Sequence, residues 1–387
     1  MAQSIVPFLD LSREYRALGP RLLAALDGVL SQQRFILGDE VAALEREVAA
    51  RCGVSHAVGC ASGTDALWLA LAAAGIGPGA AVLTTPFSFF ATVSAILRAG
   101  AVPVLADIEP ESFNLSPQAA RICVEGQKTI RAILPVHLFG QAVLWDDFLS
   151  LQREFRESRG GLWLIEDAAQ ALGARWGDAA VGSLGDAAAF SFYPTKNLAA
   201  AGDAGMVATA DDGIAERIRL LRQHGMRHRY HHEVVGWNSR LDTLQAALLL
   251  VKLPLLDDWN ARRRALAAHY AALLEKAGLA EPGPYPRQGV VLPRTHPKAT
   301  HVFHQYVIRV PRRDELKAFL DARGIGSEIY YPVPLHLQPA FAALGYGPGD
   351  FPEAERAARE VLALPIYPQL EMEEQECVVA AIADFLS

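Results

Sequence analysis

One lysine lies in a local sequence that favours chemistry. Lys196 follows the apolar run Phe190-Ser191-Phe192 and the tripeptide Tyr193-Pro194-Thr195, and small residues continue from Ala199 to Gly205. Proline ends regular structure, and small residues let backbone or a ligand approach closely. A lysine held in a turn at the end of a buried strand loses hydration, which favours its neutral, nucleophilic amine. Such an amine suits a Schiff base, although a lysine taken alone is more often a solvated surface residue.

Two further polar segments follow apolar runs of strand length. Ala61-Ser62-Gly63-Thr64-Asp65 comes after 57–60 and opens a predicted helix, and Glu166-Asp167-Ala168-Ala169-Gln170 comes after 162–165. Free backbone amides and the positive helix end make the first segment a candidate phosphate site. A carboxylate in the second segment could pair with a cationic ring nitrogen. Taken alone, each segment also fits an ordinary helix cap.

The elements that must position these segments alternate between strands and helices. Short apolar runs alternate with helical stretches closed by glycine, starting at residue 57 and continuing to the strand predicted at 206–209. This alternation predicts right-handed crossovers and a mostly parallel sheet covered by helices on both faces. Ligands bind such sheets at the carboxyl ends of the strands, so the three segments are expected to meet there.

The two ends of the chain predict different organisation. An N-terminal arm (1–19), punctuated by Pro7, Asp10 and Gly19-Pro20, precedes a first helix at about 20–34. A long helix kinked at Pro254 continues to about residue 276 and connects two domains. Beyond it we expect strands at 302–310 and 326–330 and helices at 314–323, 352–361 and 371–386. The predicted domains are a large α/β domain (20–255) and a small α+β domain (256–387).

Composition excludes several functional classes. The chain has 387 residues with 51% hydrophobic and 20% charged residues, which indicates a globular protein. Its net charge of −7, without a basic block, argues against nucleic acid as a partner. Four scattered cysteines without Cys-x-x-Cys spacing predict neither disulfides nor zinc, and the pair His231-His232 has no further ligand at suitable spacing. No secretory signal or membrane span is recognisable, so a cytoplasmic protein is expected.

Four blocks occurring in order carry a family resemblance. They are 61–67, 166–170, Ser191-Phe192-Tyr193-Pro194-Thr195-Lys196-Asn197 and Asn238-Ser239-Arg240-Leu241-Asp242. Together they resemble the DegT/StrS-type nucleotide-sugar aminotransferases, pyridoxal-phosphate enzymes of the aspartate aminotransferase fold (fold type I). The resemblance covers nearly the whole chain, from Phe8 to Pro368. It implies a seven-stranded, mostly parallel sheet flanked by helices, followed by the small α+β domain.

The resemblance also implies cofactor-binding roles. Lys196 would form the Schiff base with pyridoxal 5'-phosphate and later transfer a proton, and Asp167 would keep the pyridine nitrogen protonated. Gln170 would bond the ring hydroxyl, and Phe89 would stack on the ring. The phosphate would be held by Ser62, Gly63, Thr64 and Ser191, and by Asn238 from a neighbouring subunit, which implies a homodimer with shared active sites.

The implied reaction is a ping-pong transamination. L-glutamate would convert the cofactor to pyridoxamine 5'-phosphate and leave as 2-oxoglutarate, and the amine would pass to a keto group of a nucleotide-linked sugar. The loop 328–336 favours carbon 3 over carbon 4. Amino sugars of this kind enter lipopolysaccharide, O-antigen or other glycans. Substrate contacts are expected from Tyr193, Arg240, His304, Gln305, Tyr306 and Tyr331.

Two other functions remain open. The acceptor could be a keto-cyclitol in place of a nucleotide sugar. Alternatively, the protein could be a non-catalytic, pyridoxal-phosphate-binding regulator on the same scaffold, although the intact Lys196, Asp167 and phosphate loop argue against this. A related group that replaces the lysine with histidine dehydrates sugars, and Lys196 argues against that reaction.

Overall fold

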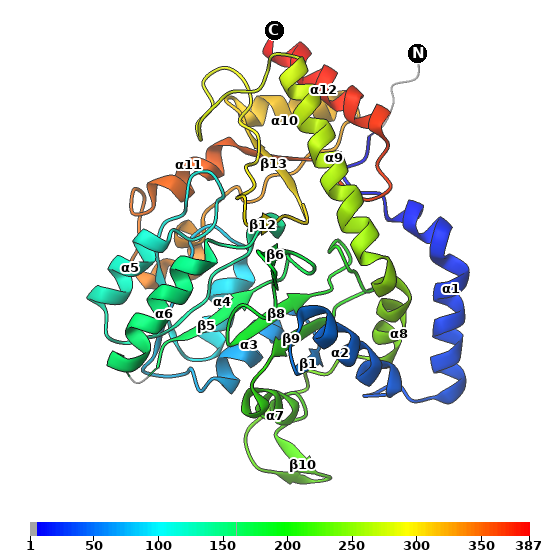
Figure 1. Cartoon of the computed structure of the whole chain (residues 1–387), viewed down its shortest axis with the longest axis vertical. Helices are drawn as coiled ribbons and strands as arrows, with labels where there is room; N and C mark the ends of the chain where they lie inside the picture. The colour runs from blue at the N-terminus through cyan, green and yellow to red at the C-terminus, as the bar shows by residue number, and fades with distance from the viewer. Residues whose placement is uncertain (1–5, 160) are drawn as a thin grey trace.

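A seven-stranded sheet forms the centre of the computed structural model, which describes residues 6–159 and 161–387 (Figure 1). The strand order is β1-β9-β8-β5-β4-β2-β3. β9 runs antiparallel to both β1 and β8, and the remaining neighbours are parallel. The predicted mostly parallel sheet is therefore confirmed. The strands are β1 His56–Cys60, β2 Ala81–Thr84, β3 Val102–Leu105, β4 Ile130–Ile133, β5 Trp163–Asp167, β8 Ala187–Ser191 and β9 Gly205–Thr209.

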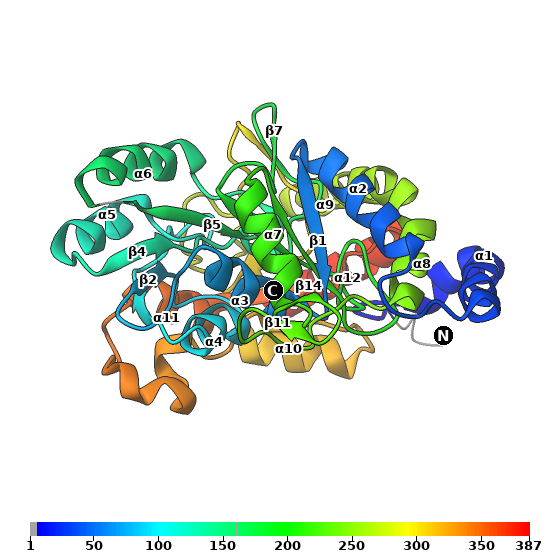
Figure 2. The ribbon, with the colours of Figure 1, turned by 90° about the horizontal axis from the view of Figure 1, so that it is seen from below.

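Helices cover both faces of this sheet, and each face has its own apolar core. Figure 2 shows α6 on one side of β4 and β5 and α4 on the other. The first core receives side chains from α2 Asp39–Cys52, α5 Pro117–Gly126, α6 Trp145–Arg159 and α8 Thr243–Lys252. The second receives them from α3 Gly63–Ala73, α4 Phe90–Arg98 and α7 Asp212–Leu221. This arrangement places the N-termini of α3 and α4 at the edge where the parallel strands end.

The N-terminal helix begins earlier than the sequence pattern predicted. α1 spans Leu11–Gln32 and contains Pro20, so residues 11–19 of the predicted arm are helical. The side chain of Asp10 accepts a hydrogen bond from the amide of Ser12 and caps the helix. Pro20 was interpreted as a breaker, but the true start signal is Asp10. Residues 1–5 of the predicted arm lie outside the described residues.

The kink at Pro254 is confirmed. α8 is followed by the 3₁₀ turn η2 Leu253–Leu255 and by α9 Leu256–Lys276. α9 leads into the C-terminal part, where β13 Tyr306–Arg309 pairs antiparallel with β14 Val361–Leu364. Helices α10 Arg313–Ala322, α11 Pro352–Glu360 and α12 Met372–Leu386 pack around this pair, with the 3₁₀ turns η3 Leu335–Leu337 and η4 Pro339–Leu344. The positions of the domain boundaries stay predictions.

The predicted strand at 326–330 is wrong. This segment makes a single bridge between Glu328 and Ala363. The second strand of the C-terminal sheet is instead β14, which follows α11 directly and has no turn residue to announce it. The remaining short elements are β6 Arg175–Trp176, β7 Ala179–Ala180, β10 Met226–His228, β11 His231–His232, β12 Ala299–Thr300 and η1 Leu138–Gly140. Within the described ranges, no helix has both the length and the apolar character needed to cross a membrane.

Candidate active site

A cavity of about 590 Å³ lies where β5 and β8 end. Its walls come from the first turns of α3 and α4, the end of β5, the turn after β8 and two segments near residues 304 and 330. Eight of the nine residues predicted to hold a cofactor line it: Ser62, Gly63, Thr64, Phe89, Asp167, Gln170, Ser191 and Lys196. The rule that ligands bind at strand carboxyl ends therefore located the cavity correctly.

Lys196 lies in a turn five residues after the end of β8. Its backbone amide donates a 2.8 Å hydrogen bond to the carbonyl of Tyr193. Burial lowers the pKa of the Lys196 amine from 10.5 to about 8, and the nearby charge of Asp167 acts in the opposite direction. At neutral pH this lysine therefore has a larger neutral, nucleophilic fraction than a solvated one.

Asp167 ends β5 and is the buried carboxylate of the cavity, with 4% of its surface exposed. Its Oδ2 accepts a 2.8 Å hydrogen bond from the hydroxyl of Thr92, and its Oδ1 accepts one from the amide of Ala169. Burial raises the pKa of Asp167, while these hydrogen bonds and the charge of Lys196 counteract the rise. A cationic group entering the cavity would stabilise the ionised carboxylate further.

Thr92 is a residue that sequence reasoning missed. It lies in the first turn of α4, where its hydroxyl also contacts that of Ser88 at 2.8 Å. Its partner Asp167 is 75 residues away along the chain, so no local pattern signals the contact. We class Thr92 as a positioning residue, because it acts through Asp167.

Replacing Thr92 with valine keeps the shape of the side chain but removes the donor. The buried Asp167 oxygen then lacks its partner, and we expect the free energy of unfolding at pH 7 to fall by about 1–3 kcal/mol. Urea denaturation measures this change. Ser94→Ala is the matched control on the same helix, since that hydroxyl makes only a 3.4 Å bond to the carbonyl of Ala91. Equal losses in both variants would contradict the assignment.

The first turn of α3 forms the end of the cavity suited to an anion. Ser62 caps the helix through a 3.1 Å bond from the amide of Asp65, and the first-turn amides of Gly63 and Thr64 have no partner within the helix. A Cβ on Gly63 would lie 2.5 Å from the Cβ of Ser191, and one on Gly205 would lie 2.3 Å from the carbonyl oxygen of Ser62. Glycine at both positions therefore lets α3, β8 and β9 converge.

Aromatic and amide side chains form another wall. Phe89 is 58% exposed, and its ring centroid lies 6.4 Å from that of Tyr331. Gln170 donates through Nε2 to the Tyr331 hydroxyl at 3.2 Å, and its Oε1 accepts from the amide of Phe139 at 2.6 Å. Burial raises the pKa of Tyr331, which keeps its hydroxyl neutral. Phe89 thus presents an open ring face beside a fixed polar pair.

The predicted substrate residues divide into two groups. Tyr193, His304, Gln305 and Tyr331 line the cavity, and burial lowers the pKa of His304, so its imidazole is neutral. Arg240 and Tyr306 do not line the cavity of their own chain, and neither does Asn238, the residue predicted to hold the cofactor phosphate of a neighbouring subunit. Asn238 is exposed, and its backbone pairs with Gln223.

Tyr306 requires a correction, because its position does not support a substrate contact. The side chain is 1% exposed and stacks on Tyr270, with 5.0 Å between the ring centroids. Both rings belong to the apolar core of the C-terminal part. Tyr306 begins β13, and this register turns its side chain toward the core, whereas the preceding His304 and Gln305 reach the cavity.

Comparison with known proteins identifies the family. Residues 17–383 match the sequence profile of the DegT/DnrJ/EryC1/StrS aminotransferase family. The chain belongs to this family. A pleiotropic regulatory protein of Geobacillus stearothermophilus is 50% identical and covers 98% of both chains. A dTDP-3-amino-3,4,6-trideoxy-alpha-D-glucose transaminase of Streptomyces venezuelae is 44% identical over 98% of this chain and 96% of its own.

A solved relative confirms the fold. The crystal structure of S. venezuelae DesV in complex with a ketimine intermediate superposes with a TM-score of 0.92, at 44% identity and covering 99% of both chains. The predicted family, fold class and aminotransferase class are therefore confirmed. Among the residues that the structure describes, no group of three or more His, Cys, Asp or Glu side chains could hold a metal ion.

Proposed function

We propose that this family member is a pyridoxal-phosphate-dependent aminotransferase that acts on a keto group of a nucleotide-linked sugar. The observation that carries the proposal is the meeting of Lys196 and Asp167 in one cavity with the free amides that open α3. A lysine with a lowered pKa, a buried carboxylate and an anion site are the three groups that this cofactor requires. Membership of an aminotransferase family supports it.

The residues present fit pyridoxal phosphate. The first-turn amides of α3 and the hydroxyl of Ser191 would hold the phosphate, and Phe89 offers a ring face for stacking. Asp167 would pair with the pyridine nitrogen, and the Lys196 amine would bind the aldehyde carbon. Gln170 would reach the ring hydroxyl through the second hydrogen of its Nε2. When bound, this cofactor supplies an electron sink for the carbon that loses a proton.

The chain itself supplies proton transfer and orientation. The neutral Lys196 amine would act as the nucleophile and, when free, as the base that removes and returns the substrate proton. Asp167, held by Thr92 and the amide of Ala169, would place a negative charge against the ring nitrogen of a bound cofactor. Tyr331 and Gln170, hydrogen-bonded to each other at 3.2 Å, form one wall that would orient the substrate.

The lowered pKa of Lys196 predicts the pH dependence of cofactor capture. Only the neutral amine reacts, so the capture rate should rise about tenfold per pH unit below the pKa and level off above about pH 8. Stopped-flow absorbance of the cofactor-free protein mixed with pyridoxal phosphate measures this rate. A rate that still rises steeply near pH 10 would show an ordinary lysine and contradict the burial argument.

The acceptor is proposed to be a 3-keto nucleotide sugar, with L-glutamate as donor. A smaller, adjoining pocket of about 270 Å³ shares His304, Gln305 and Tyr330 with the main cavity and extends it toward Glu328. This extension gives room for a substrate longer than the cofactor. The name of the S. venezuelae relative, a 3-amino-sugar transaminase, supports carbon 3 over carbon 4. Amination for lipopolysaccharide, O-antigen or another glycan stays a prediction.

We also propose a homodimer with shared active sites. α1 exposes four large apolar side chains, Leu11, Tyr15, Leu23 and Leu30. The hairpin region after α7 exposes Tyr230 and Val235, and each of these two side chains is 80% exposed. Figure 1 shows this β10 hairpin standing away from the body of the protein. Asn238, just beyond it, would reach the cofactor phosphate of the partner subunit. The four cysteines are free thiols, which fits a reducing cytoplasm.

A regulatory protein is the second candidate, because the G. stearothermophilus relative is named as one. A keto-cyclitol acceptor is the third possibility and would share every cofactor contact described above. The cavity of this chain retains both Lys196 and Asp167, and this supports catalysis over regulation alone. A panel of keto-sugars and keto-inositols offered to the amine-loaded enzyme would separate the two acceptors.

The deciding test is the visible spectrum of the purified protein with pyridoxal phosphate, before and after L-glutamate. A transaminase should show a yellow band that bleaches with glutamate and returns with 2-oxoglutarate. A band that ignores glutamate and every other amino donor would favour the regulatory function. Absence of any band would refute the assignment of Lys196.

A further inference from the structure

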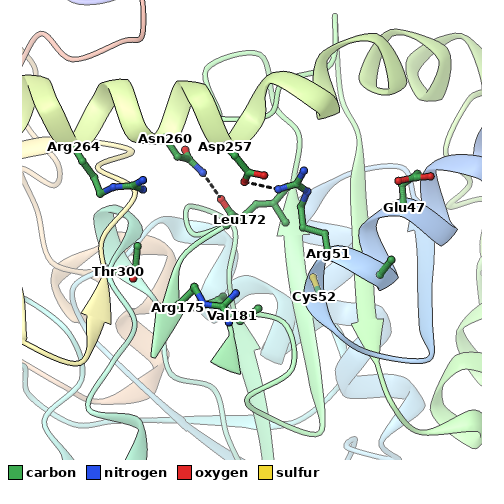
Figure 3. Close-up of a pocket in the computed structure, with 13 residues that line it drawn as sticks. Glu47, Arg51, Cys52, Leu172, Arg175, Val181, Asp257, Asn260, Arg264 and Thr300 are labelled. Carbon is green, nitrogen blue, oxygen red and sulfur yellow. Dashed lines mark hydrogen bonds and ion pairs between the residues drawn. The ribbon is translucent and has the colours of Figure 1, made fainter. Parts of the chain in front are cut away.

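A second large cavity lies apart from the candidate active site. It has a volume of about 510 Å³ and lies between the end of α2, the first half of α9 and the short strands β6 and β7 (Figure 3). None of the residues that line it also lines the active-site cavity. The proposed aminotransferase reaction therefore does not use it.

Three arginines from separate elements surround this space. Arg51 comes from α2, Arg175 from β6 and Arg264 from α9 (Figure 3). Glu47 and Asp257 are the lining carboxylates, so three positive charges face two negative ones. The wall is therefore cationic in a protein whose net charge is −7.

Among the described residues, two of these three guanidinium groups form no ion pair. Arg51 forms a 2.5 Å ion pair with Asp257, whose side chain is 71% exposed. Arg175 donates to the backbone carbonyl of Asp178, which carries no charge. Within residues 6–159 and 161–387, the side chain of Arg264 has neither a hydrogen bond nor an ion pair. Two forked donors that make no ion pair with a described residue thus face this concave space, where Asp257 is already paired with Arg51 and Glu47 is the remaining lining carboxylate.

The guanidinium donors of this cavity indicate which kind of ligand it can bind. The planar guanidinium fork matches the oxygens of a phosphate group and binds them in pairs, more strongly than neutral donors do. The hydroxyl of Thr300 adds a neutral polar group for the rest of a ligand. The volume accommodates a phosphorylated small molecule and is too small for a folded partner. We propose that this cavity binds a small metabolite that carries a phosphate group.

The site also has a direct link to the catalytic turn. Asn260 forms part of the cavity wall, and its Oδ1 accepts a 2.8 Å hydrogen bond from Nδ2 of Asn197. Asn197 follows Lys196 in the chain and also contacts Nδ1 of His304 at 3.2 Å. A ligand here would therefore contact the residue that holds the turn after Lys196, which is a suitable position for an effector.

Isothermal titration of the full-length protein with inorganic pyrophosphate tests the proposal. The titration is done near neutral pH and low salt, with and without bound pyridoxal phosphate. We expect saturable binding in both states, since the two cavities share no lining residue. Arg264→Ala should weaken this binding roughly tenfold or more, and Arg264→Lys less, because lysine keeps the charge but loses the fork.

Arg46→Ala is the matched control. Arg46 lies on α2 like Arg51, is exposed, and does not line the cavity, so its loss removes the same charge without touching the site. The affinity of Arg46→Ala for pyrophosphate should equal that of the unaltered protein. The thermal unfolding midpoint of Arg264→Ala should also equal that of the unaltered protein. Absence of binding, equal weakening in both variants, or binding that disappears when pyridoxal phosphate is present would overturn the proposal. The last result would assign the anion to the active site.

Discussion

Lys196→Ala is expected to fold normally and to lose transamination. Lys196 supplies both the nucleophile and the base of the proposed reaction, and no other lysine of the described ranges lines the cavity. Loss of proton transfer alone lowers the rate by about 10²- to 10⁴-fold, and the loss of the covalent link to the cofactor adds to this. The yellow band of the bound cofactor should also be absent. Single-turnover kinetics with L-glutamate and the visible spectrum measure the two effects.

A second substitution at the same position separates the effect of the positive charge from that of the neutral amine. Lys196→Arg keeps the positive charge but cannot be deprotonated at any usable pH, so it should be as inactive as Lys196→Ala. Lys298→Ala is the surface control, because that side chain is 59% exposed and its ammonium pairs with Asp146 at 2.6 Å. A small primary amine added to Lys196→Ala should restore part of the proton transfer. Substantial activity of either Lys196 variant in the absence of added amine would refute the role proposed for this residue.

The fold could be predicted because its signals are local and repeat. Each strand of the central sheet is a short apolar run, and the helices between them carry their own caps and glycine stops. Since parallel strands present their carboxyl ends at one edge, three polar segments far apart in the chain were predicted to meet there. Asp167 and Lys196 line one cavity for this reason.

What could not be predicted depends on contacts between distant segments or on register. Thr92 supports Asp167 across 75 residues, and nothing in its own segment marks that role. Tyr306 adjoins two cavity residues, but as the first residue of β13 its side chain joins the core. Pro20 resembles a helix breaker, although α1 continues through it. The three arginines of the second cavity lie on α2, β6 and α9, so only the folded chain brings them together.

Asp167→Asn is expected to lower activity by about 100-fold or more without destabilising the protein. Asparagine keeps the shape of the side chain but cannot hold a positive charge on the ring nitrogen of the cofactor. Loss of such a preorganised charge interaction removes about 3 kcal/mol of transition-state stabilisation. Single-turnover kinetics with L-glutamate should therefore show a slow step, while the cofactor still binds to Lys196 and remains yellow.

The free energy of unfolding of Asp167→Asn, unlike its activity, should not fall. Burial raises the folded-state pKa of Asp167 above its ordinary value of 3.8, so the ionised form opposes folding. In the cofactor-free protein, the stability that comes from protonated Asp167 is fully present below pH 3.8. It is lost as the pH rises through the higher folded-state pKa. Asparagine carries no charge and avoids that loss, so cofactor-free Asp167→Asn should be at least as stable as the unaltered protein at pH 7.

Urea denaturation of both cofactor-free proteins at pH 4 and pH 7 measures this difference. Asp211→Asn is the matched control: Asp211 is an exposed helix cap whose Oδ1 accepts from the amide of Ile214, and it lies outside the cavity. We expect the control to leave the single-turnover rate unchanged. If Asp167→Asn were instead both unstable and inactive, the carboxylate would be a structural requirement of the sheet edge, and its role toward the cofactor nitrogen would lose its support. The combination of retained stability and lost activity is what a charge placed for chemistry, at the expense of folding, must produce.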